Sequence, residues 1–222
     1  MKKTANLNDG CNPELVVGAE FDGILEIPII YSEQDLAVPE NITPFTFREK
    51  AVGTEEAIGF FEKDIQFANV LQNPDEYIND FKRFHALISV DCSLYRDAPL
   101  AAQVTNLYRN RALGSFYQRN GSHVIPLIRW GNEYTYTTKY FPEKIAFLGV
   151  EKNSTVCIGT YGCIKTREDK YYFQAGLDSM LEELTPKTVL VYGAMSNSVF
   201  GNYSKYTKFI TCPDWITRMH GR

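Results

Sequence analysis

Residues 89–114, SVDCSLYRDAPLAAQVTNLYRNRALG, hold the densest group of side chains that could do chemistry. A short apolar run ends in a carboxylate, two hydroxyls, an arginine and a second carboxylate: Asp91, Ser93, Tyr95, Arg96 and Asp97. Carboxylates can transfer protons or bind cations, and an arginine can bind a carboxylate or a phosphate through two hydrogen bonds. Because these groups follow a run that is typical of a buried strand, the sequence predicts a site at its end.

Other predicted strands also end in polar or aromatic residues. Glu62 and Asp64 follow residues 57–61, and Arg129, Trp130 and Glu133 lie at or after the end of residues 124–130. Tyr192 ends the run 188–193. In parallel α/β folds the carboxyl ends of strands meet at one rim, where ligands bind. We therefore predict Asp64 and Asp91 as catalytic groups, and the predicted ligand-binding residues are Ser93, Tyr95, Arg96, Arg109, Arg129, Trp130 and Tyr192.

The same residues allow a metal hypothesis and several structural alternatives. Asp64, Asp91 and Glu133 could hold Mg²⁺ or share acid–base work. Alternatively, Asp91 pairs with Arg129 across adjacent strands, and Asp97 caps the helix that it precedes. No residue beyond these three is predicted as a metal ligand.

The paired arginines Arg109 and Arg111 cannot serve one ligand from one helix face. They lie two positions apart and so diverge by roughly 200° around the helix. Arg109 lies near the predicted apolar stripe, which is formed by Ala101, Val104, Tyr108, Ala112 and Phe116. Its side chain is therefore predicted to reach the core or the rim. There it either binds a carboxylate or phosphate of a ligand, or it forms a structural ion pair with Asp91 or Asp97.

Continuously apolar strands separated by capped amphipathic helices indicate parallel β-α-β units. Strands are predicted at 24–31, 57–61, 86–91, 124–130, 154–162, 188–193 and 207–211, with a long loop over 32–56. We predict an α/β fold, an irregular or incomplete (β/α) barrel with mainly parallel strands; the alternative is an open doubly wound sheet. Residues 57–222 would form one globular unit, and residues 1–56 an N-terminal extension packed on it.

Composition excludes several functional classes. The 222 residues carry a net charge of −4, which argues against nonspecific nucleic-acid binding through a basic coat, although residues 81–130 hold seven Lys or Arg against two acids. Five cysteines without a C-x-x-C pair and three scattered histidines make a structural zinc site improbable. The start lacks a signal-peptide core and no apolar run is long enough for a membrane span, so we predict a cytoplasmic protein.

The stretch S-x-D-x-S-L-Y-x-D-x-P-L-A-x-Q and the Y-R-N-R-x-x-G that follows it resemble an uncharacterised domain family of bacteriophages, prophages and mobile elements. The signature residues here are Asp91, Ser93, Tyr95, Asp97, Pro99, Gln103, Tyr108, Arg109, Asn110, Arg111 and Gly114. The resemblance spans residues 57–220 and leaves the first 56 outside. It implies a phage or mobile-element origin, and host cytoplasm as the location, but no activity.

Two functions follow as hypotheses. The first is an enzyme, or a former enzyme, that acts on a phosphate-bearing ligand such as a nucleotide or nucleic acid and resembles a metal-dependent hydrolase. The second is a binding protein that counters host defence by sequestering a nucleotide signal or docking on a host protein. A DNA-binding regulator fits poorly with a pI of about 5.5.

Overall fold

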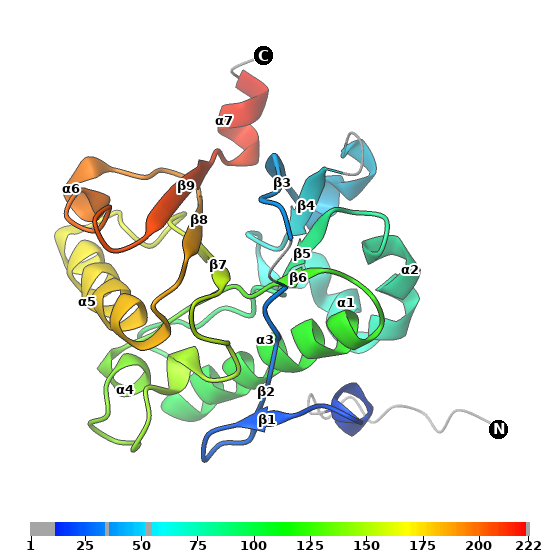
Figure 1. The fold of residues 1–222 in the computed structure, drawn as a ribbon, viewed down its shortest axis with the longest axis horizontal. Helices are drawn as coiled ribbons and strands as arrows, with labels where there is room; N and C mark the ends of the chain where they lie inside the picture. Colours follow the sequence, from blue (N-terminus) through cyan, green and yellow to red (C-terminus); the bar gives the residue numbers. More distant parts are fainter. Residues whose placement is uncertain (1–11, 34–35, 52–54, 221–222) are drawn as a thin grey trace.

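Seven short parallel strands follow one another in chain order in this computed structural model, which describes residues 12–33, 36–51 and 55–220 (Figure 1). Four form one sheet in the order β3-β4-β5-β6 and three form another in the order β7-β8-β9. Their bounds are β3 Asn41–Pro44, β4 Glu56–Gly59, β5 Ala86–Ile88, β6 Val124–Ile125, β7 Thr155–Gly159, β8 Thr188–Tyr192 and β9 Lys208–Cys212.

The two sheets meet just after β6. Leu127 and Cys157 form a parallel bridge, in which Ile128 N donates to Cys157 O at 2.8 Å and Cys157 N donates to Pro126 O at 2.9 Å. All seven strands therefore point the same way. Across the described residues, no strand pairing joins β9 to β3. The predicted α/β fold with mainly parallel strands is confirmed; its pairing fits an irregular, incomplete (β/α) barrel and also an open sheet.

The inner faces of the strands share one apolar core. It includes at least one side chain from each of the seven strands: Ile42, Ala57, Ala86, Ile88, Ile125, Cys157, Leu190, Tyr192 and Cys212. Successive side chains of a strand point to opposite faces, so the neighbouring residues pack outward against helices. Ile58 and Leu87 pack in a cluster with residues of α2 and α3, whereas Val156 and Val189 pack in a cluster with residues of α5.

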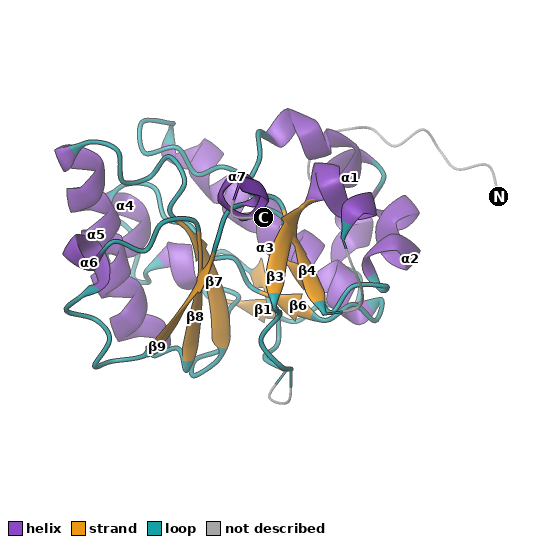
Figure 2. Cartoon of the chain, turned by 90° about the horizontal axis from the view of Figure 1, so that it is seen from above, coloured by secondary structure: helices purple, strands orange, loops and turns teal. Residues whose placement is uncertain are grey.

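Helices cover the outer faces of both sheets (Figure 2). The two longest are α3 (Leu100–Arg119) and α5 (Arg167–Leu184), and α5 begins with a capping box formed by Thr166 and Asp169. The shorter α-helices are α1 Ala68–Gln72, α2 Ile78–Phe81, α4 Glu133–Tyr136, α6 Asn197–Phe200 and α7 Trp215–His220. The 3-10 helices are η1 Pro13–Val16, η2 Phe45–Lys50, η3 Asp64–Phe67, η4 Pro74–Tyr77 and η5 Ile145–Phe147.

Two predictions for the first part of the chain were wrong. The run 24–31 does not join the parallel strands; it contributes β2 (Ile27–Pro28), which pairs antiparallel with β1 (Phe21–Asp22). The predicted loop 32–56 instead contains β3 and η2. Flanking prolines conceal β3 in the sequence, but Pro44 is tolerated at the end of a strand that pairs on one side only.

The start of α3 also differs from its prediction. The helix begins at Leu100 with Pro99 at the N-cap, and no side chain caps it. Asp97 is thus not the cap, because it lies three residues before the first helical residue.

Within the described residues, we find no helix whose length and apolarity would let it cross a membrane.

The buried face of α3 holds polar as well as apolar side chains, and it includes only part of the predicted stripe. Ala101 is exposed, whereas Gln103, Asn110 and Arg111 are buried. Asn110 Oδ1 accepts from Ser89 Oγ at 3.1 Å, and its Nδ2 donates to Val90 O at 2.6 Å. Polar side chains can face the core here because they bond to backbone groups at the ends of short strands.

Arg111 is the largest fully buried side chain. Its Nε donates to Leu148 O at 2.9 Å, its Nη1 to Leu127 O at 2.9 Å and its Nη2 to Ala146 O at 3.3 Å. Burial lowers the pKa of Arg111 to about 9, and the charge of Asp22 opposes that shift. The arginine therefore connects α3 to the segments around β6 and η5, and it does not point to solvent or to a ligand.

Candidate functional site

A pocket of about 740 Å³ lies at the carboxyl ends of the strands. Its wall takes residues from the end of, or the segment following, each of the seven strands, among them Pro44, Phe61, Asp91, Arg129, Gly159, Tyr192 and Asp214. The volume is in the range of small-molecule and cofactor sites. The position is the one that the strand-end rule predicts for a ligand.

Most of the predicted site residues come together in this pocket, and two do not. Those that line it are Asp91, Ser93, Tyr95, Arg96, Arg129, Trp130 and Tyr192. Asp64 and Arg109 are not among the lining residues. Arg109 Nη1 donates to Asn106 Oδ1 at 3.2 Å, one turn earlier on α3. The assignment of roles to these residues stays a prediction.

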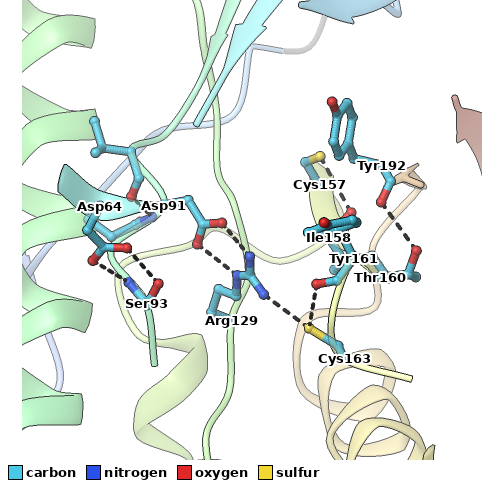
Figure 3. Close-up of polar contacts among 12 residues, drawn as sticks. Asp64, Asp91, Ser93, Arg129, Cys157, Ile158, Thr160, Tyr161, Cys163 and Tyr192 are labelled. Carbon is cyan, nitrogen blue, oxygen red and sulfur yellow. Dashed lines mark hydrogen bonds and ion pairs between the residues drawn. The ribbon is translucent and has the colours of Figure 1, made fainter. Parts of the chain in front are cut away.

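Asp91 and Arg129 form an ion pair at the base of the pocket (Figure 3). Arg129 Nε donates to Asp91 Oδ1 at 2.7 Å and Nη2 donates to Oδ2, so the pair is bidentate. The Asp91 side chain is 2% exposed and that of Arg129 is 22% exposed. Burial alone would lower the pKa of Arg129, but Asp91 and then Cys163 outweigh it and raise that pKa. Asp91 thus pairs with Arg129 across adjacent strands, which was the structural alternative to a catalytic or metal-binding role.

The third edge of the Arg129 guanidinium faces a cysteine. Arg129 Nη1 donates to Cys163 Sγ at 3.2 Å, and Cys163 itself lines the pocket (Figure 3). Cys163 was not among the predicted site residues, so its contact with Arg129 was missed. The signal available was its position just beyond the end of β7, the same signal that marked the other strand-end residues.

The carboxylates of the metal hypothesis are held apart by separate partners. Asp64 accepts from Ser93 Oγ at 2.7 Å and from Ser93 N at 3.2 Å, while Glu133 pairs with Lys139 at 3.7 Å. Nowhere in residues 12–33, 36–51 and 55–220 do three or more His, Cys, Asp or Glu side chains form a group that could hold a metal ion. The predicted meeting of Asp64, Asp91 and Glu133 around one ion is therefore wrong.

Stacked aromatic rings form another part of the wall. The rings of Phe61 and Tyr192 stack with centroids 4.2 Å apart and an interplanar angle of 10°. Gly159 makes room for this pair, because a Cβ there would lie 2.8 Å from the Phe61 ring. A second stack joins Phe47, from η2, to Trp215, from α7, at 4.8 Å. Phe47 was missed because its segment was predicted to be a loop.

The remaining predicted residues lie on the β5–β7 side of the pocket. Arg96 pairs with Asp169 at 3.4 Å and Glu168 at 3.6 Å, and its guanidinium lies 4.6 Å from the Tyr172 ring centroid. Trp130 packs on Phe173 of α5, with ring centroids 5.2 Å apart. Tyr95 is 63% exposed at the rim.

The charged residues of the pocket lie on two sides, and each side holds both cations and carboxylates. Three cations line it (Lys63, Arg96, Arg129), against five carboxylates (Glu62, Asp91, Asp97, Asp169, Asp214). Arg96 and Arg129 lie on the β5–β7 side with their paired acids. Glu62 and Asp214 lie at the ends of β4 and β9, beside the two aromatic stacks. The pocket thus has arginines on its β5–β7 side and stacked aromatic rings at the ends of β4 and β9.

The phenol of Tyr192 gives a pH test of this geometry. Burial raises its pKa to about 12, with help from the charges of Asp214 and Glu62, while the hydrogen bond from Trp215 N acts in the opposite sense. Because the unfolded phenol loses its proton near pH 10, the folded state holds more protons between pH 10 and 12. The free energy of unfolding contributed by Tyr192 therefore falls as pH rises through this window.

We expect the stability of the wild type relative to Tyr192→Phe to fall by about 1–3 kcal/mol between pH 9.5 and 12, since each pKa unit corresponds to about 1.4 kcal/mol. Urea unfolding of both proteins at several pH values measures it. A constant difference across the window would contradict the burial of this phenol.

Comparison with known proteins places this chain in a phage context. A family model described as a domain of unknown function, DUF4417, matches residues 19–211. The Gene 1 protein of Mycobacterium phage D29 is 31% identical over 161 residues, 71% of this chain and 57% of that protein. The Gene 1 protein of Mycobacterium phage L5 is 30% identical over 148 residues, 67% of this chain and 62% of that protein. The chain thus spans about three fifths of the length of these relatives.

No solved structure matches the chain. The family match starts at residue 19, before the expected start at 57, and so includes β1, β2 and β3. It covers most of the chain, and the relatives agree with the predicted phage origin of the family. The chain belongs to the DUF4417 family, a phage-associated domain of unknown function.

Proposed function

We propose that this protein binds a nucleotide in the strand-end pocket and holds it without turnover. The observation that carries the proposal is a pocket of about 740 Å³ with stacked aromatic rings on one side and arginines on the other. Nucleobases stack on aromatic side chains and phosphates bind arginines, so the two sides suit the two ends of a nucleotide.

The phosphate would lie at the cationic side. Arg129 Nη1 lies beyond the Asp91 pair, where it donates to Cys163 Sγ, and the partly exposed Arg96 has long ion pairs with Asp169 and Glu168 and a contact with the Tyr172 ring. Lys63 also lines the pocket and has no ion pair to another described residue. Because five carboxylates face three cations, a monophosphate suits the pocket better than a triphosphate, whose charge they would repel.

Binding is favoured over catalysis by the state of the two predicted catalytic aspartates. Asp91 is occupied by Arg129, and Asp64 accepts two hydrogen bonds from Ser93 and lies outside the pocket lining. A general acid or base must contact the substrate and must have an oxygen that is free to donate or accept a proton. The metal-dependent hydrolase hypothesis also needs a group of carboxylates that could hold the metal ion, and the described residues contain no such group.

A phage protein with such a pocket would act in the cytoplasm of the infected host. Sequestering a nucleotide signal would counter a host defence that depends on that signal. The Gene 1 relatives in two mycobacteriophages support the phage setting. The lining of the pocket supports a small phosphate-bearing molecule as the proposed partner.

Calorimetric titration with the four ribonucleoside monophosphates tests the proposal. We expect at least one to bind with a Kd in the micromolar range, and Arg96→Ala to weaken it about tenfold through loss of a charge-assisted hydrogen bond. Lys152→Ala, which removes a surface ion pair with Glu183, is the matched control and should not change the affinity. Absence of binding at millimolar nucleotide would refute the proposal.

Chromatography of the same samples decides between binding and turnover. The nucleotide should be recovered unchanged after incubation with the protein and Mg²⁺. Conversion that is abolished by Asp91→Asn would instead favour the hydrolase hypothesis.

A further inference from the structure

Two carboxylates beside the aromatic stacks are fixed in orientation. Glu62 follows Phe61 directly and accepts from both Thr46 N, at 3.1 Å, and Thr46 Oγ1. Asp214 precedes Trp215 and accepts from Thr217 N and Thr217 Oγ1, both at 2.9 Å. Each carboxylate is thus held by the amide and hydroxyl of a single threonine. Since an ionised carboxylate oxygen can accept more than one hydrogen bond, each keeps acceptor capacity for a ligand.

Glu62 and Asp214 line the same pocket as Tyr192, whose ring is stacked on Phe61. Their negative charges help to raise the pKa of that phenol, and the Tyr192 hydroxyl accepts from Trp215 N at 3.2 Å. Glu62 directly follows Phe61 in the chain, and Asp214 directly precedes Trp215, so each carboxylate adjoins a residue that stacks or bonds in this group of rings. A base stacked in this part of the pocket presents its own edge to them.

The Glu62 and Asp214 carboxylates accept hydrogen bonds, and the neighbouring lining residues with side-chain donors are Lys63, Tyr192 and Trp215. Among the lining residues that the structure describes there is no Asn, Gln or His, whose side chains could pair with both donors and acceptors of a base. Acceptor-only groups select a base edge by its N–H donors and disfavour an edge that carries bare nitrogens or carbonyls.

The four bases differ in this respect. Guanine presents two adjacent donors, N1–H and the 2-amino group, which match the two oxygens of one carboxylate. Adenine and cytosine place a bare ring nitrogen beside their amino group, and uracil places its single N–H between two carbonyls. A bidentate, charge-assisted pair is therefore available to guanine alone.

We infer that the pocket selects guanine, with the Glu62 carboxylate accepting from N1–H and the 2-amino group of a base stacked beside Phe61 and Tyr192. The inference rests on the proposed nucleotide function and deepens it by naming the base. Glu62 takes this role before Asp214 because it directly follows the stacked Phe61 in the chain, whereas the Asp214 hydrogen bonds also hold the first turn of α7.

Titration calorimetry with GMP, IMP and AMP tests the inference. GMP should bind at least 30-fold more tightly than AMP, and IMP, which keeps N1–H and lacks the 2-amino group, should fall between them. Glu62→Gln should reduce the GMP-to-AMP ratio to threefold or less, because the amide turns one acceptor into a donor. Its carbonyl can still accept from Thr46, so folding should persist, and Glu183→Gln on the surface is the matched control that should leave the ratio unchanged.

The outcomes separate the inference from the proposed function. Equal affinities for GMP and AMP overturn guanine selection but leave nucleotide binding in place. A ratio that survives Glu62→Gln and collapses in Asp214→Asn overturns the assignment to Glu62. Failure of GMP, IMP and AMP to bind while CMP or UMP binds overturns the inference alone, whereas failure of all four ribonucleoside monophosphates overturns the proposed function with it.

Discussion

Replacing Arg111 by alanine is expected to destabilise the protein by about 4–5 kcal/mol or more, or to prevent folding. The side chain is fully buried and donates to the carbonyls of Leu148, Leu127 and Ala146. Its removal leaves a cavity and buried carbonyls without these donors, each of which costs about 1–3 kcal/mol. That loss exceeds the gain from no longer burying a charge.

Arg111→Met separates the two causes. Methionine fills most of the volume and restores none of the hydrogen bonds, so we expect a smaller loss, about 1–3 kcal/mol. Urea unfolding followed by circular dichroism measures both variants. Arg83→Ala, at a 46% exposed side chain with surface ion pairs, is the control and should change stability by less than about 1 kcal/mol. Equal losses for Arg111→Ala and Arg83→Ala would contradict a structural role for Arg111.

The second large effect is expected at the Asp91–Arg129 pair. Arg129→Ala should destabilise the protein by about 3–5 kcal/mol, because it leaves a carboxylate in the core without its partner. Asp91→Ala should cost less, since the Arg129 side chain is 22% exposed to the pocket and can be hydrated, whereas Asp91 is 2% exposed. The double variant should lose less than the sum of the two single losses by about 1–3 kcal/mol.

Unfolding measurements on the four proteins of this cycle give the coupling directly. Additive losses would mean that the bidentate pair contributes nothing beyond its separate residues. A larger loss for Asp91→Ala than for Arg129→Ala would reverse the asymmetry that follows from their burial. Either result would count against the ion pair as the feature that organises the base of the pocket.

The rim was predictable from the sequence because it depends on local pattern. Apolar runs ending near Asp91, Arg129 and Tyr192 marked strand ends, and the parallel arrangement brings strand ends together. The capping box of Thr166 and Asp169 was predictable for the same reason, since both residues belong to one turn. These features need no knowledge of distant contacts.

Features that depend on contacts distant in the sequence were not predictable. Whether Asp91 is free or paired depends on a distance to Arg129 across two strands. The buried face of α3 carries Asn110 and Arg111 because free backbone carbonyls lie opposite them, which hydrophobic periodicity cannot register. The stack of Phe47 on Trp215 joins the beginning and the end of the strand array.

The central claim is that a nucleotide occupies the strand-end pocket, and tryptophan fluorescence tests it most directly. Both tryptophans of the chain, Trp130 and Trp215, line this pocket, so their emission reports on its occupancy alone. Titration with GMP should change the tryptophan emission in a saturable way. Trp215→Phe should remove most of this change, because Trp215 belongs to the aromatic side of the pocket. Inorganic phosphate should change the emission only slightly. An emission that stays constant up to millimolar GMP would contradict the claim.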